Sequence, residues 1–504
     1  MRQTRPEAQV SPEHRRLREC LEAEPGHWLA GVMPHLVTAQ MAWFHRRFWT
    51  HVWKCDASSA PKPLLFPLFR DGGKSTSAET AALALGLTGR RRYGLYVSGT
   101  QALADDHLAS IQDAWLSNRF AQMWYPDAAP RMSREGTSGA RATWRHNRLS
   151  FGNGFTIDAV GLDSSFRGAK IGSARPDLII VDELDDIDDS PATTAKKLLR
   201  LTTSLLPTAG AEGAFVLVVQ NLIRRKSVMD QLCSDDPPAL RNALLIGPIP
   251  MVEGAVWDET PDGDRILVGG KSSWPGRYSF EQCVQKSIDY GEQAFRSECQ
   301  HELDVDISGT LLKRRHFRIR RGHLGIDAAV VGVDPAGKGK PGSDMTGIIG
   351  AGRMSNGEWV VLADRSAVFE DATWPEAAVD LAIEIGARQI AYEDNGLGDA
   401  GLRLLKGAAR ERRWTGRIVP KSAVRGASKE VRAEPLARAY QDGLVWHVED
   451  LSDLEDEWCL WIPGVSAWSP NRIDAEVWAF ELLGLAAGGS RRSNRTRRAI
   501  PSRR

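Results

Sequence analysis

The fold is decided by residues 64–76, which read Leu-Leu-Phe-Pro-Leu-Phe-Arg-Asp-Gly-Gly-Lys-Ser-Thr. The apolar start of this stretch predicts a buried strand, and the Ala- and Leu-rich residues 77–87 predict a helix. A glycine turn between a strand and a helix lets successive backbone N–H groups and the helix N-terminus surround an anion. The stretch therefore predicts an α/β fold with a phosphate-binding loop at residues 70–76.

The side chains of this loop match nucleotide chemistry in part. Lys74 is placed to reach the terminal phosphates, and the Ser75 hydroxyl is placed to bind Mg²⁺. Leu68 stands where the full P-loop pattern has its first glycine, and the negative side chain of Asp71 should point away from a phosphate. A glycine turn without a ligand is the alternative for the loop taken alone. The candidate nucleotide-binding residues are Asp71, Gly72, Gly73, Lys74, Ser75 and Thr76.

A second segment, residues 177–183, reads Asp-Leu-Ile-Ile-Val-Asp-Glu and predicts an apolar strand that ends in two acids. At such a strand end Asp182 can hold Mg²⁺ and Glu183 can polarise the attacking water. A solvated acidic loop explains residues 185–189 well. It explains Asp182 and Glu183 poorly once the Lys74 loop lies upstream, so the two segments together favour ATP hydrolysis.

Length and composition bound the rest of the chain. The 504 residues correspond to two or three domains at roughly 150 residues each. With 42% hydrophobic and 26% charged residues, the chain is neither mostly disordered nor fibrous. No apolar run approaches the roughly 20 residues of a membrane-spanning helix, so we do not expect the chain to be an integral membrane protein. The six cysteines form no Cys-x-x-Cys pair, and we expect neither a cysteine zinc site nor a disulfide framework.

Charge is balanced in sum and uneven along the chain. The 65 basic and 64 acidic residues give a net charge of +1. Basic residues gather at 90–92, 313–321 and 491–504, and acids gather at 182–189. Local basic stripes can hold a polyanion such as nucleic acid, whereas solvated faces and a flexible tail are the alternative for each run taken alone.

Strands and helices alternate in two regions. In the first, apolar runs at 64–66, 93–98, 177–181 and 214–219 are separated by helical stretches, which predicts a parallel sheet. Between the regions we expect one helix at 280–303. The second region begins with three strands in a row, at 329–333, 346–350 and 359–362, followed by a helix at 374–385 and a strand at 389–393. Further helices are expected at 401–413, 429–441 and 474–486, an order compatible with a ribonuclease H-like fold.

Acids stand at the ends of strands in this second region as well. Asp334 and Glu393 each end a predicted strand, and Asp474 opens the last predicted helix. Asp344 follows a Gly- and Lys-rich loop just before the next predicted strand. Several converging carboxylates can hold two Mg²⁺ or Mn²⁺ ions against a phosphodiester. Taken singly, each acid is explained as a cap or turn residue. Asp474 is a plausible helix N-cap, and Asp394 could replace Glu393 as the ligand.

Together these segments resemble the large terminase subunit of tailed bacteriophages and prophages, an ATPase and nuclease that packages DNA. The resemblance extends from about residue 30 to 486, and the ordered set is more specific than any one member. The segments that carry it are residues 70–76, Ser165-Phe166-Arg167-Gly168, Arg175-Pro176-Asp177, Asp182-Glu183, Asp334-Pro335-Ala336, Ser343-Asp344, residues 392–395 and residues 472–479.

The resemblance implies a P-loop (ASCE-type) ATPase domain with a parallel sheet, followed by a ribonuclease H-like nuclease domain. The expected segments are a polar extension at 1–25, the ATPase domain at 26–225, a subdomain or linker at 226–325, the nuclease domain at 326–487 and an Arg-rich tail at 488–504.

The resemblance also implies residue roles. Glu183 is the catalytic base for ATP hydrolysis, Arg70 acts on the γ-phosphate, and Ser75 and Asp182 hold Mg²⁺. Asp334, Glu393 and Asp474 are the catalytic and metal-binding acids of the nuclease, with Asp344 as an auxiliary metal-binding acid. Residues 219–221 fall where such motors carry a coupling segment, although Gln-Asn departs from the small-residue and Thr pattern. The basic residues implied to lie near DNA are Lys421, Lys429 and Arg432.

The implied cofactors are ATP and Mg²⁺, with Mn²⁺ as a possible ion at the nuclease site. The implied partners are double-stranded DNA, a portal protein, a small terminase subunit and further copies of the chain in a ring on the procapsid, with no membrane. The implied location is the host bacterial cytoplasm, transiently at the procapsid portal. The alternatives are a helicase-like DNA-remodelling ATPase with an inactive nuclease-like domain, and a non-enzymatic DNA-binding adaptor.

Overall fold

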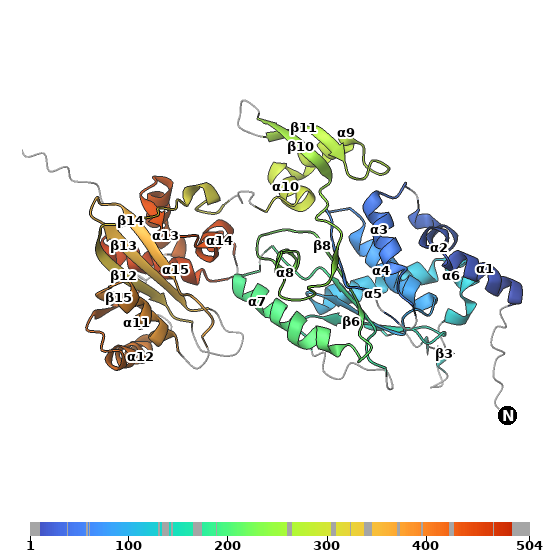
Figure 1. Cartoon of the computed structure of the whole chain (residues 1–504), viewed down its shortest axis with the longest axis horizontal. Helices are drawn as coiled ribbons and strands as arrows, with labels where there is room; N and C mark the ends of the chain where they lie inside the picture. The colour runs from blue at the N-terminus through green and yellow to red at the C-terminus, as the bar shows by residue number, and fades with distance from the viewer. Residues whose placement is uncertain are drawn as a thin grey trace, which may run out of the picture. The chain divides into compact units, whose positions relative to one another are not determined.

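The chain folds into two compact units, Met1–Val305 and Asp306–Arg504, seen in a computed structural model (Figure 1). The structure describes residues 11–485 except 38, 57–58, 60, 130–131, 134–140, 143–144, 165–173, 188, 260–264, 304–308, 323, 337–344, 370–372, 395–396, 423–427 and 467. Each unit has its own β-sheet with helices on both faces.

The first unit is built on a seven-stranded sheet in the order β5-β6-β2-β7-β8-β1-β9. All neighbouring strands pair in parallel except β5, which is antiparallel to β6. Since β8 lies between β1 and β7, one strand separates the loop-bearing strand from the acid-bearing strand, as in ASCE-type ATPases. The strands are β1 (Leu64–Pro67), β2 (Tyr93–Ser98), β5 (Arg148–Ser150), β6 (Thr156–Gly161), β7 (Leu178–Asp182), β8 (Phe215–Gln220) and β9 (Leu244–Leu245).

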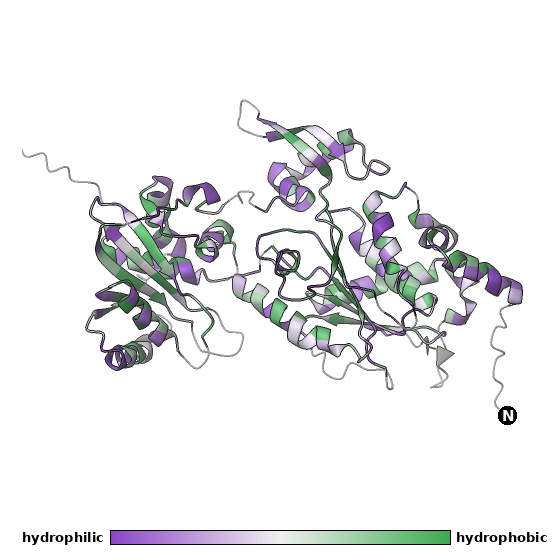
Figure 2. Cartoon of the chain, viewed as in Figure 1, coloured by the Kyte–Doolittle hydropathy of each residue, from purple (hydrophilic) through white to green (hydrophobic). Residues whose placement is uncertain are grey.

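Both faces of this sheet are buried, which is why its central strands β1, β7 and β8 are mostly apolar. Alternate strand residues such as Phe66 and Ile180 pack with α3 (Trp43–Val52), α4 (Lys74–Leu87) and α5 (Gln101–Leu116). The intervening residues pack on the opposite face with the segment after α7 (Pro191–Arg200) and with α8 (Val228–Leu232). Figure 2 shows the hydrophobic strands of both sheets between more polar helices.

Further elements complete the first unit. The segment expected as one helix at 280–303 is two helices, because Gly291 at φ 79° and ψ 153° breaks the helical backbone. The expected single helix was therefore wrong. The other elements are α1 (Pro12–Glu22), α2 (Pro25–Val32), α6 (Arg119–Trp124), β3 (Met132–Ser133), β4 (Arg141–Ala142), the hairpin of β10 (Val252–Glu259) and β11 (Arg265–Ser272), α9 (Phe280–Tyr290) and α10 (Glu292–Gln300).

The second unit has a six-stranded sheet in the order β16-β15-β12-β13-β14-β17. The first three strands in sequence pair antiparallel, and β15 returns to pair parallel with β12, which is the ribonuclease H-like arrangement. The expected fold class is thereby confirmed for both units. The strands are β12 (Ile326–Asp334), β13 (Gly347–Met354), β14 (Trp359–Asp364), β15 (Gln389–Glu393), β16 (Arg417–Lys421) and β17 (Val445–His447).

One helix of this unit lies unusually close to its sheet. A Cβ on Gly332 of β12 would come within 1.9 Å of the Ala475 carbonyl oxygen, and one on Gly347 of β13 within 1.9 Å of the Asn471 oxygen. Glycine at both positions therefore lets α15 (Asn471–Leu483) lie directly on the two strands. The other helices are α11 (Trp374–Glu384), α12 (Gly398–Glu411), α13 (Lys429–Gln441) and α14 (Ser452–Leu460). No helix in the described ranges is long and apolar enough to cross a membrane.

Candidate functional site

The phosphate-binding loop has the backbone that its glycines permit. Gly73 adopts φ 82° and caps α4, which begins at Lys74. A Cβ on Gly72 would lie 2.5 Å from the Leu68 side chain, so the tight turn needs glycine there. His45 holds the turn from outside, because its Nε2 lies 2.9 Å from the Gly72 carbonyl oxygen. The N-terminus of α4 is thus open to an anion, while Leu68 fills the space beneath the turn.

Two side chains of the loop turn toward the helices that follow the hairpin. Asp71 is bound by the Lys286 ammonium at 2.6 Å and by the Tyr290 hydroxyl at 2.9 Å, both on α9. Arg70 lies 3.6 Å from Glu298 of α10 and its side chain is 59% exposed. The carboxylate of Asp71 therefore has one cationic and one hydroxyl partner outside the loop, and Arg70 is accessible.

Asp182 and Glu183 lie opposite the loop, at the end of β7. Asp182 is completely buried, and its Oδ2 accepts a hydrogen bond of 2.9 Å from the Tyr96 hydroxyl. Burial raises the pKa of Asp182 to about 6. Burial lowers the pKa of Lys74, and the nearby charges of Asp182 and Glu183 oppose this shift. The structure therefore brings Lys74 close to both acids across 108 residues of sequence.

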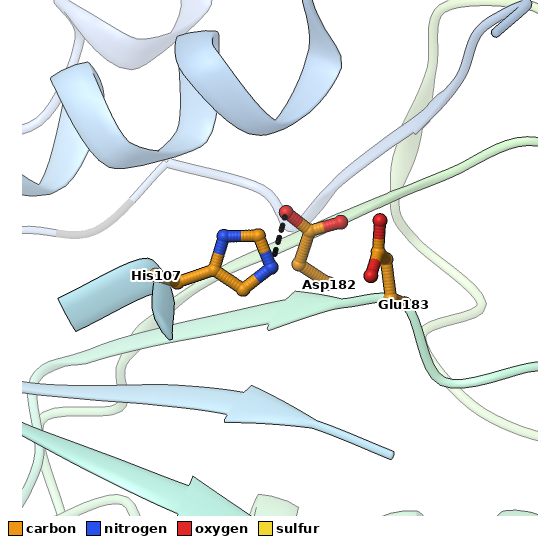
Figure 3. Close-up of side chains that lie close together, drawn as sticks. All are labelled: His107, Asp182 and Glu183. Carbon is orange, nitrogen blue, oxygen red and sulfur yellow. Dashed lines mark ion pairs between the residues drawn. The ribbon is translucent and has the colours of Figure 1, made fainter. Parts of the chain in front are cut away.

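His107 is the residue that sequence reasoning missed. It comes from α5, and its Nε2 lies 3.7 Å from Asp182 Oδ2 (Figure 3). Ligand atoms of His107, Asp182 and Glu183 all lie within 4.8 Å of one another. Burial would lower the pKa of His107, but its bond to Glu79 and the charges of both acids raise it. The sequence offered no signal for it, because the residue lies 75 positions before Asp182 with no ligand spacing.

The end of β8 and the residue that follows it connect the acid-bearing loop to α10. Gln220 Oε1 accepts hydrogen bonds from the backbone N–H groups of Leu184 and Asp185 at 2.8 and 3.1 Å. Asn221 donates a hydrogen bond of 2.6 Å to Glu298. The two residues that depart from the resembled pattern at 219–221 thus contact the residue after Glu183 on one side and the partner of Arg70 on the other.

In the second unit, three buried acids converge from separate elements. Asp334 ends β12, Glu393 ends β15, and Asp474 lies on the face of α15 that the two glycines admit to the sheet. Ligand atoms of the three lie within 4.8 Å of one another. Burial raises the pKa of Asp334 well above its usual value, and repulsion by Asp474 and Glu393 adds to the rise. A divalent cation would relieve this repulsion, so the residues fit a metal site.

Basic side chains surround this cluster. Lys429 forms an ion pair with Asp474, and Arg432 lies 3.3 Å from Asp474 and 3.8 Å from Glu393. Arg432 also stacks on the Trp478 ring, and the Trp478 indole donates a hydrogen bond to Glu393. Lys429 and Arg432 therefore offset part of the negative charge of the cluster.

The structure also places the other residues that the sequence suggested for this site. Asp474 is not the N-cap of its helix, because the helix begins at Asn471 after Pro470. Asp394 accepts a hydrogen bond from Ser422 and is not in the cluster, whereas Glu393 is. Lys421 pairs with Glu481 of α15. Asp344 and residues 165–168 lie outside the described residues.

Comparison with known proteins finds structural likenesses only. No model of a protein family matches the chain, and no curated protein matches it. A large terminase from a thermophilic bacteriophage matches at 10% identity over 88% of this chain and 98% of that one, with a TM-score of 0.35. The nuclease domain of the large terminase subunit gp2 of bacterial virus Sf6 matches at 17% identity over 31% and 89%, with a TM-score of 0.25. A yeast mitochondrial Holliday junction resolvase matches at 10% identity over 31% and 80%, with a TM-score of 0.21.

Proposed function

We propose that the chain is an ATP-driven DNA motor and metal-dependent endonuclease of the large terminase type. It would move double-stranded DNA into procapsids and cut concatemeric DNA. The observation that carries the proposal is the pairing of two sites in one chain. Lys74 faces Asp182 and Glu183 at one sheet, and three buried acids meet at the edge of a second, ribonuclease H-like sheet.

In the first unit, the loop N–H groups and Lys74 would bind the phosphates of ATP. Ser75 and Asp182 would hold Mg²⁺, which when bound offsets the phosphate charge. Glu183 would orient the attacking water and accept its proton. Arg70, which is exposed beside the loop, would approach the γ-phosphate. Support for these roles comes from the shared position of the groups at the carboxyl ends of β1 and β7.

In the second unit, Asp334, Glu393 and Asp474, with Asp344 as the proposed auxiliary acid, would hold Mg²⁺ or Mn²⁺. When bound, the ions would stabilise charge on the attacking and leaving oxygens of a phosphodiester. Lys429 and Arg432 would leave their present carboxylate partners to bind the DNA backbone. Because such contacts are to phosphate, DNA affinity should fall steeply with salt.

The proposal extends to partners and place. A ring of copies would act on the procapsid with a portal protein and a small terminase subunit, in the host bacterial cytoplasm and transiently at the portal. The support is the presence of both proposed sites in one chain, since cutting would have to be coordinated with movement of the same duplex.

Two assays on the full chain test both halves. We expect DNA-stimulated ATP hydrolysis that Lys74→Ala abolishes and Asp334→Asn leaves intact. We expect Mn²⁺-dependent cleavage of plasmid DNA that Asp334→Asn abolishes and Lys74→Ala leaves intact. Lys406→Ala, which removes an exposed lysine of α12, is the matched control for charge. ATP hydrolysis without cleavage would favour the DNA-remodelling ATPase, and DNA binding without either activity would favour the adaptor.

A further inference from the structure

His107 places an imidazole beside Asp182, where the Mg²⁺ ion of a bound nucleotide would be expected to have only oxygen ligands. A hard cation such as Mg²⁺ is held by carboxylates, hydroxyls, phosphates and water. In this chain, α5 instead directs His107 toward the two acids at the end of β7 (Figure 3). The three side chains present ligand atoms within 4.8 Å of one another.

The tautomer of His107 is set from behind. Glu79 on α4 accepts a hydrogen bond from His107 Nδ1 at 2.8 Å. Glu79 therefore holds a proton on Nδ1, and Nε2 is the ring nitrogen that is turned toward Asp182. A carboxylate behind a histidine is the arrangement that commonly orients a metal-binding imidazole.

The distance between His107 and Asp182 suits two ligands of one ion. Nε2 and Oδ2 lie 3.7 Å apart, which is too long for a hydrogen bond. Two ligand atoms at right angles on an octahedral ion such as Mn²⁺, bound at roughly 2.2 Å, lie roughly 3.1 Å apart. An ion between the two groups would therefore draw them closer together by roughly 0.6 Å.

An independent observation points to a missing partner at the same place. Asp182 is fully buried, and its second carboxylate oxygen, Oδ1, accepts no hydrogen bond of normal geometry among the described residues. The Ser75 hydroxyl lies near enough to the carboxylate to lower its pKa. A buried carboxylate oxygen without a donor is costly unless a cation or a donor satisfies it.

We propose that His107, Asp182 and Glu183 form a binding site for a divalent transition-metal ion, with Glu79 positioning the imidazole. The site would favour Mn²⁺ over Mg²⁺, because imidazole nitrogen is a better ligand for transition metals. This inference rests on the proposed nucleotide site for its role, but the ion would bind before any nucleotide arrives. It places a transition-metal preference in the motor half of the chain, separate from the all-carboxylate cluster of the second unit.

Pulsed EPR of bound Mn²⁺ tests this directly, because ¹⁴N modulation reports an imidazole ligand. The full chain is used without nucleotide, in an Asp334→Ala, Asp474→Ala background that removes the carboxylate cluster. We expect one bound Mn²⁺ with ¹⁴N modulation. In His107→Gln the modulation should disappear and the Mn²⁺ affinity should fall by about tenfold or more. Glu79→Gln should keep the modulation and weaken affinity roughly 10–100-fold. His27→Gln, an exposed histidine of the same unit, should change neither.

Two results would overturn the proposal. One is Mn²⁺ bound with no ¹⁴N modulation, which would leave His107 as a charged partner of Asp182 only. The other is the absence of any bound Mn²⁺ in this background. The modulation in unaltered His107 protein is the primary readout, so a poorly folded variant does not decide the outcome. The ATP hydrolysis assay with Lys74→Ala tests nucleotide binding. Its result is independent of the Mn²⁺ measurement, so either proposal can fail without the other.

Discussion

The indole nitrogen of Trp478 donates a hydrogen bond of 2.7 Å to Glu393 Oε2. Trp478 follows Asp474 by four residues on α15, so both side chains lie on one face of the helix. Helix α15 therefore supplies one acid of the cluster and fixes the orientation of another. Glu393 comes from β15. The hydrogen bond therefore joins the orientation of a strand side chain to that of a helix side chain.

Trp478→Phe should weaken metal binding in the second unit while keeping the ring on which Arg432 stacks. A hydrogen bond to a charged group contributes about 1.5–3 kcal/mol, which corresponds to at least a tenfold loss of Mn²⁺ affinity if Glu393 turns away. Calorimetric titration with Mn²⁺ measures it. Trp458→Phe is the matched control, since Trp458 donates a bond of equal length to Glu476 outside the cluster. Equal Mn²⁺ affinities in the two variants would contradict the prediction.

Gly332→Ala should damage both stability and the acid cluster, because the added Cβ meets the Ala475 carbonyl oxygen at 1.9 Å. Moving α15 off β12 would cost about 3 kcal/mol and withdraw Asp474 from Asp334. Chemical unfolding and Mn²⁺ titration together measure the change. Gly407→Ala is the control, because nothing lies within 4 Å of its Cβ position in α12 and alanine favours the helix. A stable Gly332→Ala protein with normal metal affinity would show that the close approach is dispensable.

Gln220→Leu should slow ATP hydrolysis more than it weakens ATP binding. The substitution leaves the buried N–H groups of Leu184 and Asp185 without their acceptor, at about 1–3 kcal/mol, and loosens the backbone next to Glu183. We expect kcat to fall with KM for ATP little changed. Gln122→Leu on α6 also removes side-chain hydrogen bonds to backbone carbonyls, but far from this loop, and should leave kcat unchanged. A rise in KM with kcat preserved would argue against a positioning role.

The sequence was sufficient for the sheet centres and for the acids at their ends. Short apolar runs such as residues 178–181 between helical stretches are typical of strands buried on both faces, and parallel strands bring their carboxyl ends to one edge. That physical rule predicted which acids would meet, although they lie far apart in sequence. Asp334 and Glu393 lie close together because they end neighbouring parallel strands, β12 and β15.

What the sequence did not reveal depends on buried charge. Strand β6 was not predicted because it contains Asp158, which is buried against Arg148 and the Tyr93 hydroxyl. Helix α14 was not predicted because its acids suggest a solvated loop. Three of them, Glu455, Asp456 and Glu457, are buried in the structure.

The basic run at residues 90–92, for which a polyanion-binding stripe and a solvated face were both open, is taken up mostly by the fold. Arg91 is buried and donates to the carbonyl oxygens of Asp56 and Ser59, and Arg90 stacks on Trp53. Two of the three arginines therefore stabilise the fold and do not form an open basic stripe. Tertiary partners of this kind leave no periodic signal, and His107 was overlooked because its partners are equally remote.

Acid should destabilise the first unit through two buried histidines, His45 and His301. Burial lowers the pKa of each to about 4, from an ordinary value near 6.5. Between these values the unfolded chain binds protons that the folded chain does not, so stability is fully present above pH 6.5 and is lost as pH falls toward 4. Each histidine should remove about 2 kcal/mol at pH 5.

Urea unfolding of the full chain at pH 7.5 and pH 5 measures this loss. His45→Gln keeps an N–H donor for the Gly72 carbonyl but cannot titrate, so its stability should fall less between the two pH values than that of the unaltered protein. The two proteins should differ by about 2 kcal/mol in the unfolding free energy that they lose between pH 7.5 and pH 5, and this difference is the contribution of His45. Parallel losses in the two proteins would mean that His45 is accessible to protons in the folded state, and that its contact with Gly72 is less buried than the structure describes.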